Sequence, residues 1–339
     1  MLVPFSCDVV VRRPISARAV SRRLCLIAIA LVLAGCAAPV SPTASPPPPT
    51  ASPSQTPAQN PTPTLTPTQT QTSTPTPTPH LVILSIDGLR PDALLQADAP
   101  NIIALAHRGA YTWRAQTTFP PATLPSHASM LTGYGLDGHG VTWNDRRPNR
   151  STLAPTIFAT AHEAGLRTVM IVGKQKMDLF AAPGTVDSYT FAIEGDRSVA
   201  DSAIVEIEKG FDLMFIHLPN VDFFGHSTGW MSEKYIARIA QTDEAVDRIL
   251  DALPEDTTII LTADHGGHGI RHGADIPEDM TISWMIAGPN VVVDHELESP
   301  VVTTDTAATA LYVLGLSLPP DADGQIVAEA FSLAVTPAP

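Results

Sequence analysis

Carboxylate and imidazole side chains recur at three points of this 339-residue chain, each close behind a continuous apolar run. A single aspartate after an apolar run is usually a turn residue or a helix cap. Three such positions, two of them with histidines nearby, indicate a metal site instead. Carboxylate oxygens and imidazole nitrogens together suit zinc or another divalent transition metal. The residues are Asp87, Asp222, His226, Asp264 and His265.

A glycine-rich loop follows the last of these positions and reads HGGHGIRHG over residues 265–273. Such a loop can bend further histidines, His268 or His272, towards the same point. Two metal ions about 4 Å apart can clamp the attacking and leaving oxygens of a phosphoryl transfer. The pattern therefore favours a two-metal phosphohydrolase.

Thr123 supplies a hydroxyl directly before the helical run 125–132. Free backbone N–H groups and the helix dipole at such a position favour a bound phosphate. Zinc lowers the pKa even of water to about 7, so a threonine hydroxyl bound to it becomes a usable nucleophile. The alternative is that Thr123 is an ordinary helix N-cap.

Apolar runs alternate with helical patterns, which indicates βαβ units and a mainly parallel sheet covered on both faces. Such sheets bind ligands beyond the carboxyl ends of their strands, where the aspartates stand. Strands are expected at 81–86, 167–173, 189–193, 211–218, 257–262 and 280–287. Helices are expected at 91–109, 153–165, 197–209, 231–252 and 304–315.

Five ordered segments carry these residues: SIDGLRPD (85–92), TFPPATLPSHASMLTG (118–133), PNVDFFGH (219–226), TADHGGHG (262–269) and RHGAD (271–275). Together they resemble the signature of the alkaline phosphatase superfamily, most closely its nucleotide pyrophosphatase/phosphodiesterase branch. The resemblance covers nearly all of residues 81–318. It implies an alkaline-phosphatase-like three-layer α/β/α sandwich with a mainly parallel central sheet.

The resemblance also implies roles for single residues. Thr123 would form a covalent phospho-threonine intermediate, and Asn144, 21 residues later, would bind the phosphate. The family commonly continues Phe-Pro-Asn-His after its nucleophile, whereas this chain has Leu124 and Ser126 at the first and third of these places, so substrate contacts do not carry over. Two zinc ions are implied, one held by Asp87, Thr123, Asp264 and His265 and the other by Asp222, His226 and His272.

We therefore expect a phosphodiesterase or nucleotide pyrophosphatase that acts on a small-molecule phosphodiester or nucleotide. The alternatives are a phosphomonoesterase or phosphonate hydrolase on the same scaffold, and a surface-binding module that holds metal without turnover. A monoesterase needs positive charge for a second oxyanion. No arginine or third-metal motif stands beside Thr123. Lys174, after the expected strand 167–173, is interpreted as a solvated lysine, and the alternative is that it reaches the phosphate. The lack of a C/S-x-P-x-R motif argues against a sulfatase.

The charge of the chain argues against a basic groove for polymeric nucleic acid. The whole chain has a formal net charge of −14, residues 1–36 carry five arginines against one aspartate, and residues 37–79 are uncharged, so the remainder is near −18. The sequence leaves the oligomeric state open.

Residues 1–36 have the layout of a secretory signal, with a basic region, an apolar run at 24–33 and small residues before Cys36. Leu-Ala-Gly-Cys resembles a bacterial lipobox, which implies a lipid on Cys36 and an extracytoplasmic lipoprotein of the cell membrane. The alternative is an ordinary signal or anchor helix, and the long basic region favours a start codon downstream of Met1. Residues 37–80, nearly all Pro, Thr, Ser, Ala and Gln, predict a disordered tether, followed by a cysteine-free enzyme domain at 81–333.

Overall fold

Eight strands form one mixed, mostly parallel sheet in the computed structural model, which describes residues 79–332. The strand order is β4-β3-β5-β1-β6-β7-β2-β8. Strand β7 is antiparallel to both of its neighbours, and the other pairs are parallel. The strands are β1 (Leu81–Ile86), β2 (Ala110–Gln116), β3 (Thr168–Val172), β4 (Ser188–Phe191), β5 (Leu213–Leu218), β6 (Thr258–Thr262), β7 (Thr281–Ala287) and β8 (His295–Glu296).

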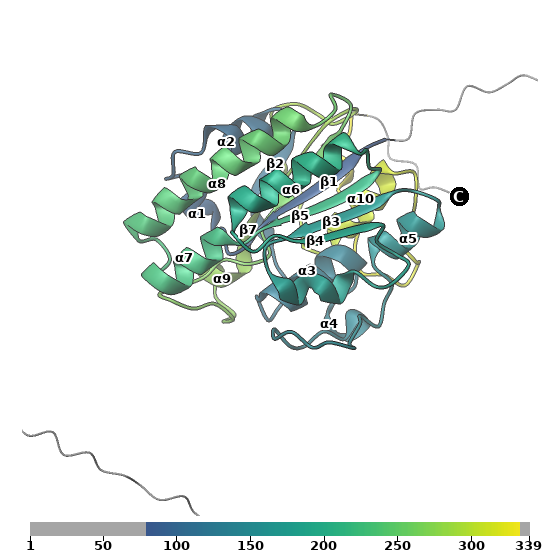
Figure 1. The fold of residues 1–339 in the computed structure, drawn as a ribbon. Helices are drawn as coiled ribbons and strands as arrows, with labels where there is room; N and C mark the ends of the chain where they lie inside the picture. The colour runs from purple at the N-terminus through teal and green to yellow at the C-terminus, as the bar shows by residue number, and fades with distance from the viewer. Residues whose placement is uncertain (1–78, 333–339) are drawn as a thin grey trace, which may run out of the picture. The chain divides into compact units, whose positions relative to one another are not determined.

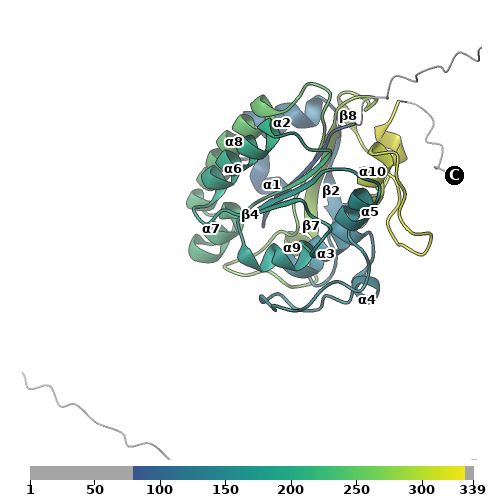
Figure 2. The same ribbon diagram turned by 45° about the vertical axis from the view of Figure 1, so that its right-hand side comes forward.

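Helices cover both faces of the sheet, which gives the three layers that the sequence predicts (Figures 1 and 2). One face carries α2, α6 and α8, and the other carries α3, α5 and α10. The helices are α1 (Pro91–Leu94), α2 (Pro100–His107), α3 (Thr123–Thr132), α4 (Leu136–His139), α5 (Ile157–Glu163), α6 (Asp196–Glu208), α7 (Asn220–Thr228), α8 (Glu233–Ala252), α9 (Pro277–Met280) and α10 (Asp305–Val313), with 3-10 turns η1 (Gln175–Phe180) and η2 (Ala328–Ala330).

The central strands explain why the sheet forms where it does. Every residue of β1, β3, β5 and β6 is buried, as strands covered on both faces must be, and each strand is a nearly continuous apolar run. Strand β1 lies between β5 and β6, so the carboxyl ends of these three strands meet at one edge. The candidate site residues lie at that edge.

Two differences from the sequence prediction lie close to the candidate site. The expected helix 91–109 is divided into α1 and α2, and the strand β2 that begins at Ala110 was not predicted. Pro100 restricts the residue before it, and Ala99 accordingly leaves the helical region with φ −131° and ψ 61°. The second difference is helix α7, which follows β5 after a single residue and was also not predicted.

The expected signal, Cys36 and nearly all of the tether lie outside the described residues, as does residue 333 at the expected end of the domain. Within residues 79–332, no helix combines the length and the apolar character needed to cross a membrane.

Candidate active site

The three aspartates are brought together by adjacent strand ends. Asp87 follows β1 directly, Asp264 follows β6, and Asp222 lies in the first turn of α7 behind β5. Gly88 has a φ of +72°, and a Cβ at this position would lie 2.9 Å from the Asp222 Cα. Only glycine lets the end of β1 approach α7 this closely.

The carboxylates and histidines form two groups, in each of which the ligand atoms lie within 4.8 Å of one another. The first group is fully buried and contains Asp87, Asp264 and His265. The second contains Asp222, His226 and His272. Helix α7 places two of its members one turn apart, and the glycine-rich loop supplies the third. The structure thus brings together every imidazole and carboxylate that the sequence predicts as a ligand.

The three histidines of the two groups, His226, His265 and His272, all direct Nε2 towards the other members of their group. The Nδ1–H groups donate to backbone carbonyls, His265 to Gly266 at 2.8 Å, His226 to Ile270 at 2.9 Å and His272 to Pro121 at 2.8 Å. Because a carbonyl can only accept, each Nε2 keeps its lone pair and faces the carboxylates. This tautomer is the one that a metal-binding histidine with a backbone partner adopts.

Unpartnered buried atoms show that this donor set fits divalent cations. Asp87 Oδ1, Asp222 Oδ1, Asp264 Oδ2 and His265 Nε2 are buried and have no hydrogen-bond partner. Leaving such atoms unpaired is costly, and one cation in each group would satisfy them. His268, the alternative to His272, lies apart from both groups and contacts Asp279 through Nδ1 at 2.7 Å.

Burial is the main influence on the protonation of these groups. Burial and the neighbouring Asp87 charge raise the pKa of Asp264 well above its ordinary value. Burial lowers the pKa of His265, and burial together with His265 lowers the pKa of His272 to about 4. Both histidines are therefore neutral at pH 7, which is the form that binds metal.

Thr123 begins helix α3 and is fully buried. Its hydroxyl lies 3.4 Å from Asp87 Oδ2, at the edge of the first group. His127, one turn later, donates from Nδ1 to the Thr123 carbonyl at 2.7 Å and accepts at Nε2 from Ser85 at 2.8 Å. The hydroxyl is thus held beside the metal-ligand groups, and the amino end of α3 points towards them.

Lys174 lies within the site, and its interpretation as a solvated lysine is wrong. Its Nζ is 2.5 Å from Asp222 Oδ2, 2.8 Å from Asp87 Oδ2 and 3.4 Å from the Thr123 hydroxyl oxygen. Burial acts to lower the pKa of Lys174, but the carboxylates of Asp87 and Asp222 raise it above its ordinary value. The chain path after β3, which the sequence does not specify, turns this side chain inward.

Asn144 is held by its amide oxygen. Oδ1 accepts from the backbone N–H of Leu124 at 3.0 Å and from Lys176 Nζ at 2.8 Å. Because the oxygen has two donors, Nδ2 is the atom left to donate to an anion beside Thr123. Lys176 was missed in the sequence, where it has no motif context.

His217 is the other residue that sequence reasoning missed. Its Nε2 lies 2.8 Å from Asp87 Oδ2, and both side chains are fully buried. His217 stands opposite Ser85 in the register of β5 against β1, which places it beneath the end of β1. An isolated histidine in an apolar run was the only available signal.

Exposed apolar side chains lie close to these residues along the chain. Phe223, beside Asp222, is 63% exposed, Ile270 in the glycine-rich loop is 65% exposed, and Phe119 is 54% exposed. Leu124 and Ser126, the two departures from the family pattern, are fully buried.

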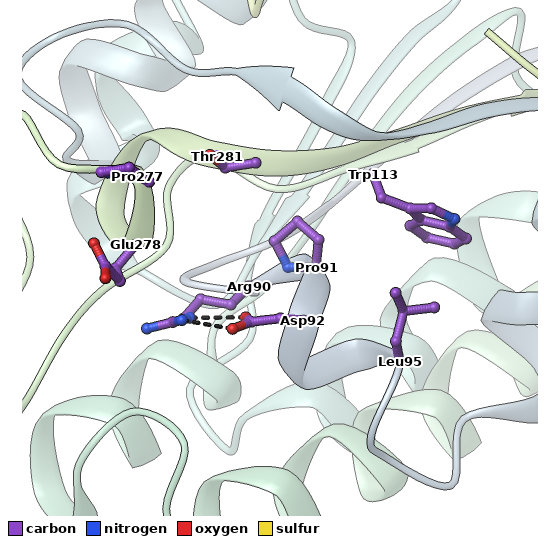
Figure 3. Close-up of a pocket in the computed structure, with 8 residues that line it drawn as sticks. All are labelled: Arg90, Pro91, Asp92, Leu95, Trp113, Pro277, Glu278 and Thr281. Atoms are coloured by element: carbon purple, nitrogen blue, oxygen red, sulfur yellow. Dashed lines mark hydrogen bonds and ion pairs between the residues drawn. The ribbon is translucent and has the colours of Figure 1, made fainter.

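A separate cavity of about 400 Å³ lies beside the glycine-rich loop, where Arg90 and Asp92 form a two-pronged ion pair (Figure 3). Arg90 also donates from Nη1 to the Gly267 carbonyl at 2.9 Å and so braces the loop that carries His265. The cavity is further lined by Leu95, Trp113, Pro277 and Glu278.

The model of the type I phosphodiesterase / nucleotide pyrophosphatase family matches residues 81–280, which include both groups, Thr123 and Asn144. The chain belongs to this family, and with it to the alkaline phosphatase superfamily, as the ordered segments predict.

Curated relatives are distant. GPI ethanolamine phosphate transferase 2 of Yarrowia lipolytica is 26% identical over 290 residues, which cover 74% of this chain and 33% of the relative. Ectonucleotide pyrophosphatase/phosphodiesterase family member 7 of Mus musculus is 25% identical over 217 residues, which cover 55% of this chain and 49% of that protein. The chain thus spans a third to a half of the length of these relatives.

Solved structures confirm the fold. Murine ectonucleotide pyrophosphatase/phosphodiesterase 5 matches with a TM-score of 0.62 at 15% identity, over 71% of this chain and 96% of that chain. An inactive variant of the murine protein was solved in complex with AMP. A 2-O GAG sulfatase matches with a TM-score of 0.59 at 17% identity, over 75% of this chain and 74% of that chain.

Proposed function

We propose that the chain is a metal-dependent hydrolase of phosphoric ester or anhydride bonds, a phosphodiesterase or nucleotide pyrophosphatase with Thr123 as its nucleophile. The observation that carries this function is a buried hydroxyl at a helix amino end, beside two carboxylate–imidazole groups with unpartnered ligand atoms. Family membership supports the same reaction class.

Two divalent cations would be held by these groups, with zinc as our choice and other transition metals as alternatives. Asp87, Thr123, Asp264 and His265 would hold one, and Asp222, His226 and His272 the other. When bound, the cations supply positive charge that lowers the pKa of the Thr123 hydroxyl and stabilises phosphoryl oxygens.

The residues of the chain would carry out the transfer of the phosphoryl group and its hydrolysis. Thr123 Oγ1 would release its proton to water and bond to phosphorus while the phosphorus–oxygen bond to the leaving group breaks, and the leaving oxygen would take up a proton from water. Water hydrolyses the phospho-threonine, which restores the hydroxyl and releases the phosphate product. Asn144 Nδ2 and the positive end of α3 hold the phosphoryl oxygens during both steps.

The substrate is proposed to be a small-molecule phosphodiester or nucleotide. The AMP complex of the murine homologue supports a nucleotide, and the acidic chain disfavours nucleic-acid polymers. The transferase relatives favour a second candidate, in which an alcohol instead of water accepts the phosphoryl group from Thr123. An alcohol acceptor included in the assay separates the two, because a transferase would form a new phosphodiester.

The test uses the full chain loaded with zinc and a nitrophenyl phosphodiester. Thr123→Ala should lower turnover by roughly three orders of magnitude or more, with metal content nearly unchanged. Thr160→Ala on α5 is the matched control and should behave as wild type. An active Thr123→Ala protein would refute the nucleophile. Two bound zinc ions without turnover of any activated ester would indicate a binding module.

We also propose that the chain is an extracytoplasmic lipoprotein, anchored to the membrane by a lipid on Cys36 and held off it by residues 37–80. The lipobox-like segment and the proline-rich composition support this localisation. Cell fractionation tests it, since Cys36→Ala should move the protein from the membrane fraction to the soluble one.

A further inference from the structure

Two lysines follow strand β3 and approach the nucleophile together. Lys174 directs its ammonium group at Asp87, Asp222 and the Thr123 hydroxyl, at 2.8, 2.5 and 3.4 Å. Lys176, two residues later, contacts Asn144 at Oδ1 and at the backbone carbonyl, at 2.8 and 3.2 Å. Both are half-buried, unlike a solvated lysine.

We propose that Lys174 and Lys176 bind the phosphoryl group and select a substrate with a second negative charge on the reacting phosphate or on the phosphate next to it, an inference that rests on the proposed function. The substrate feature that the lysines would recognise is a further phosphate oxyanion close to the reacting phosphorus. A phosphomonoester supplies it on the same phosphorus, and a phosphoanhydride supplies it on the next one.

Donor geometry supports this assignment. An ammonium group has three N–H donors, and two of those on Lys174 face buried carboxylates. The third faces Thr123 Oγ1, the atom to which the phosphoryl group would become attached. Lys176 donates to Asn144, whose Oδ1 also accepts from the backbone N–H of Leu124, the residue after Thr123, so Lys176 is linked to the nucleophile through Asn144.

Charge counting leads to the same class of substrate. The two ligand groups contain three carboxylates, so two divalent cations would leave the site with one net positive charge. The two lysines raise this to three, more than the single negative charge of a simple diester balances. A phosphate with a second oxyanion matches the site better, and the positive group that the sequence lacked beside Thr123 is thereby supplied.

The test compares two substrates with the same leaving group, p-nitrophenyl phosphate and methyl p-nitrophenyl phosphate, on the zinc-loaded full chain. Lys174→Met should lower the monoester-to-diester ratio of kcat/KM by about 10- to 100-fold, the range of a hydrogen bond to a charged group. Lys176→Met should lower it less, and Lys174→Arg should restore part of it. Lys209→Met is the control, because Lys209 is 56% exposed and pairs with Glu206.

Binding supplies a readout that does not depend on turnover. Calorimetry should show that Lys174→Met weakens the binding of inorganic phosphate, a dianion, but not of dimethyl phosphate, a monoanion. Equal losses for both substrates and both ligands would overturn the inference and leave Lys174 as a residue that only positions Asp87 and Asp222. A nucleoside diphosphate tested as a third substrate identifies the source of the second charge. A site selective for anhydrides would show a higher kcat/KM for the diphosphate than for the monoester.

Failure of the proposed function gives a different result. If Thr123→Ala retains activity, the nucleophile is wrong, whereas the contrast between phosphate and dimethyl phosphate still reports on the lysines.

Discussion

Replacing His217 by phenylalanine tests whether a histidine outside the two ligand groups holds the first of them in place. Nδ1 of His217 faces the backbone N–H of Gly173 at 3.4 Å and therefore acts as an acceptor. Nε2 then carries the hydrogen and donates to Asp87 Oδ2 at 2.8 Å. Phenylalanine keeps the ring in this buried position but removes the donor.

The expected loss follows from the burial of the pair. Both side chains are fully buried, and a hydrogen bond to a charged group contributes about 1.5 to 3 kcal/mol. Asp87 keeps the Lys174 contact at 2.8 Å, so its charge stays compensated without His217. The loss should therefore appear mainly as imprecise placement of the Asp87 carboxylate, which corresponds to about 10- to 100-fold in metal affinity.

Zinc content per chain, measured at buffered free-zinc concentrations, reports this loss directly. Wild type should bind two equivalents, and His217→Phe should lose one of them at a concentration that saturates wild type. His217→Gln retains an N–H donor and should recover part of the affinity. If His217→Phe binds both equivalents as tightly as wild type, the hydrogen bond to Asp87 has no role in holding the site.

Three further predictions concern other parts of the chain. His139 has its pKa lowered by burial to about 4, so protonation favours the unfolded chain, and its contribution to stability is complete above pH 6.5 and lost as the pH falls towards 4. Between pH 7 and pH 5 the loss should be about 2 kcal/mol, and urea unfolding of His139→Gln should show a smaller pH dependence; an equal dependence would contradict this. Asp243→Ala removes the acceptor of the Ile102 and Asn101 N–H groups at the start of α2, so unfolding should become easier by about 1 to 3 kcal/mol while kcat is kept, with exposed Glu244→Ala as the control. Gly88→Ala should displace Asp222 and lower metal content by one equivalent, and unchanged metal content would show that the close approach is not needed.

The layer architecture could be predicted from sequence because a strand that is buried on both faces is a continuous apolar run. Strand β1 is an apolar run followed directly by Asp87, and the ordered segments place Asp222, His226, Asp264 and His265 at neighbouring strand ends. The strand β2 was missed, since its residues are not continuously apolar and it pairs with a strand far along the chain.

Residue identity and local periodicity were enough to predict the candidate ligand types, the hydroxyl of Thr123 and the sheet edge at which they meet. The placement of Lys174, Lys176 and His217 around Thr123 and Asp87 came only from the three-dimensional arrangement of the chain, whereas the resemblance had already pointed to His272. These placements depend on strand register and on the path of the chain after β3. Both are set by contacts between residues distant in sequence, which leave no periodic pattern.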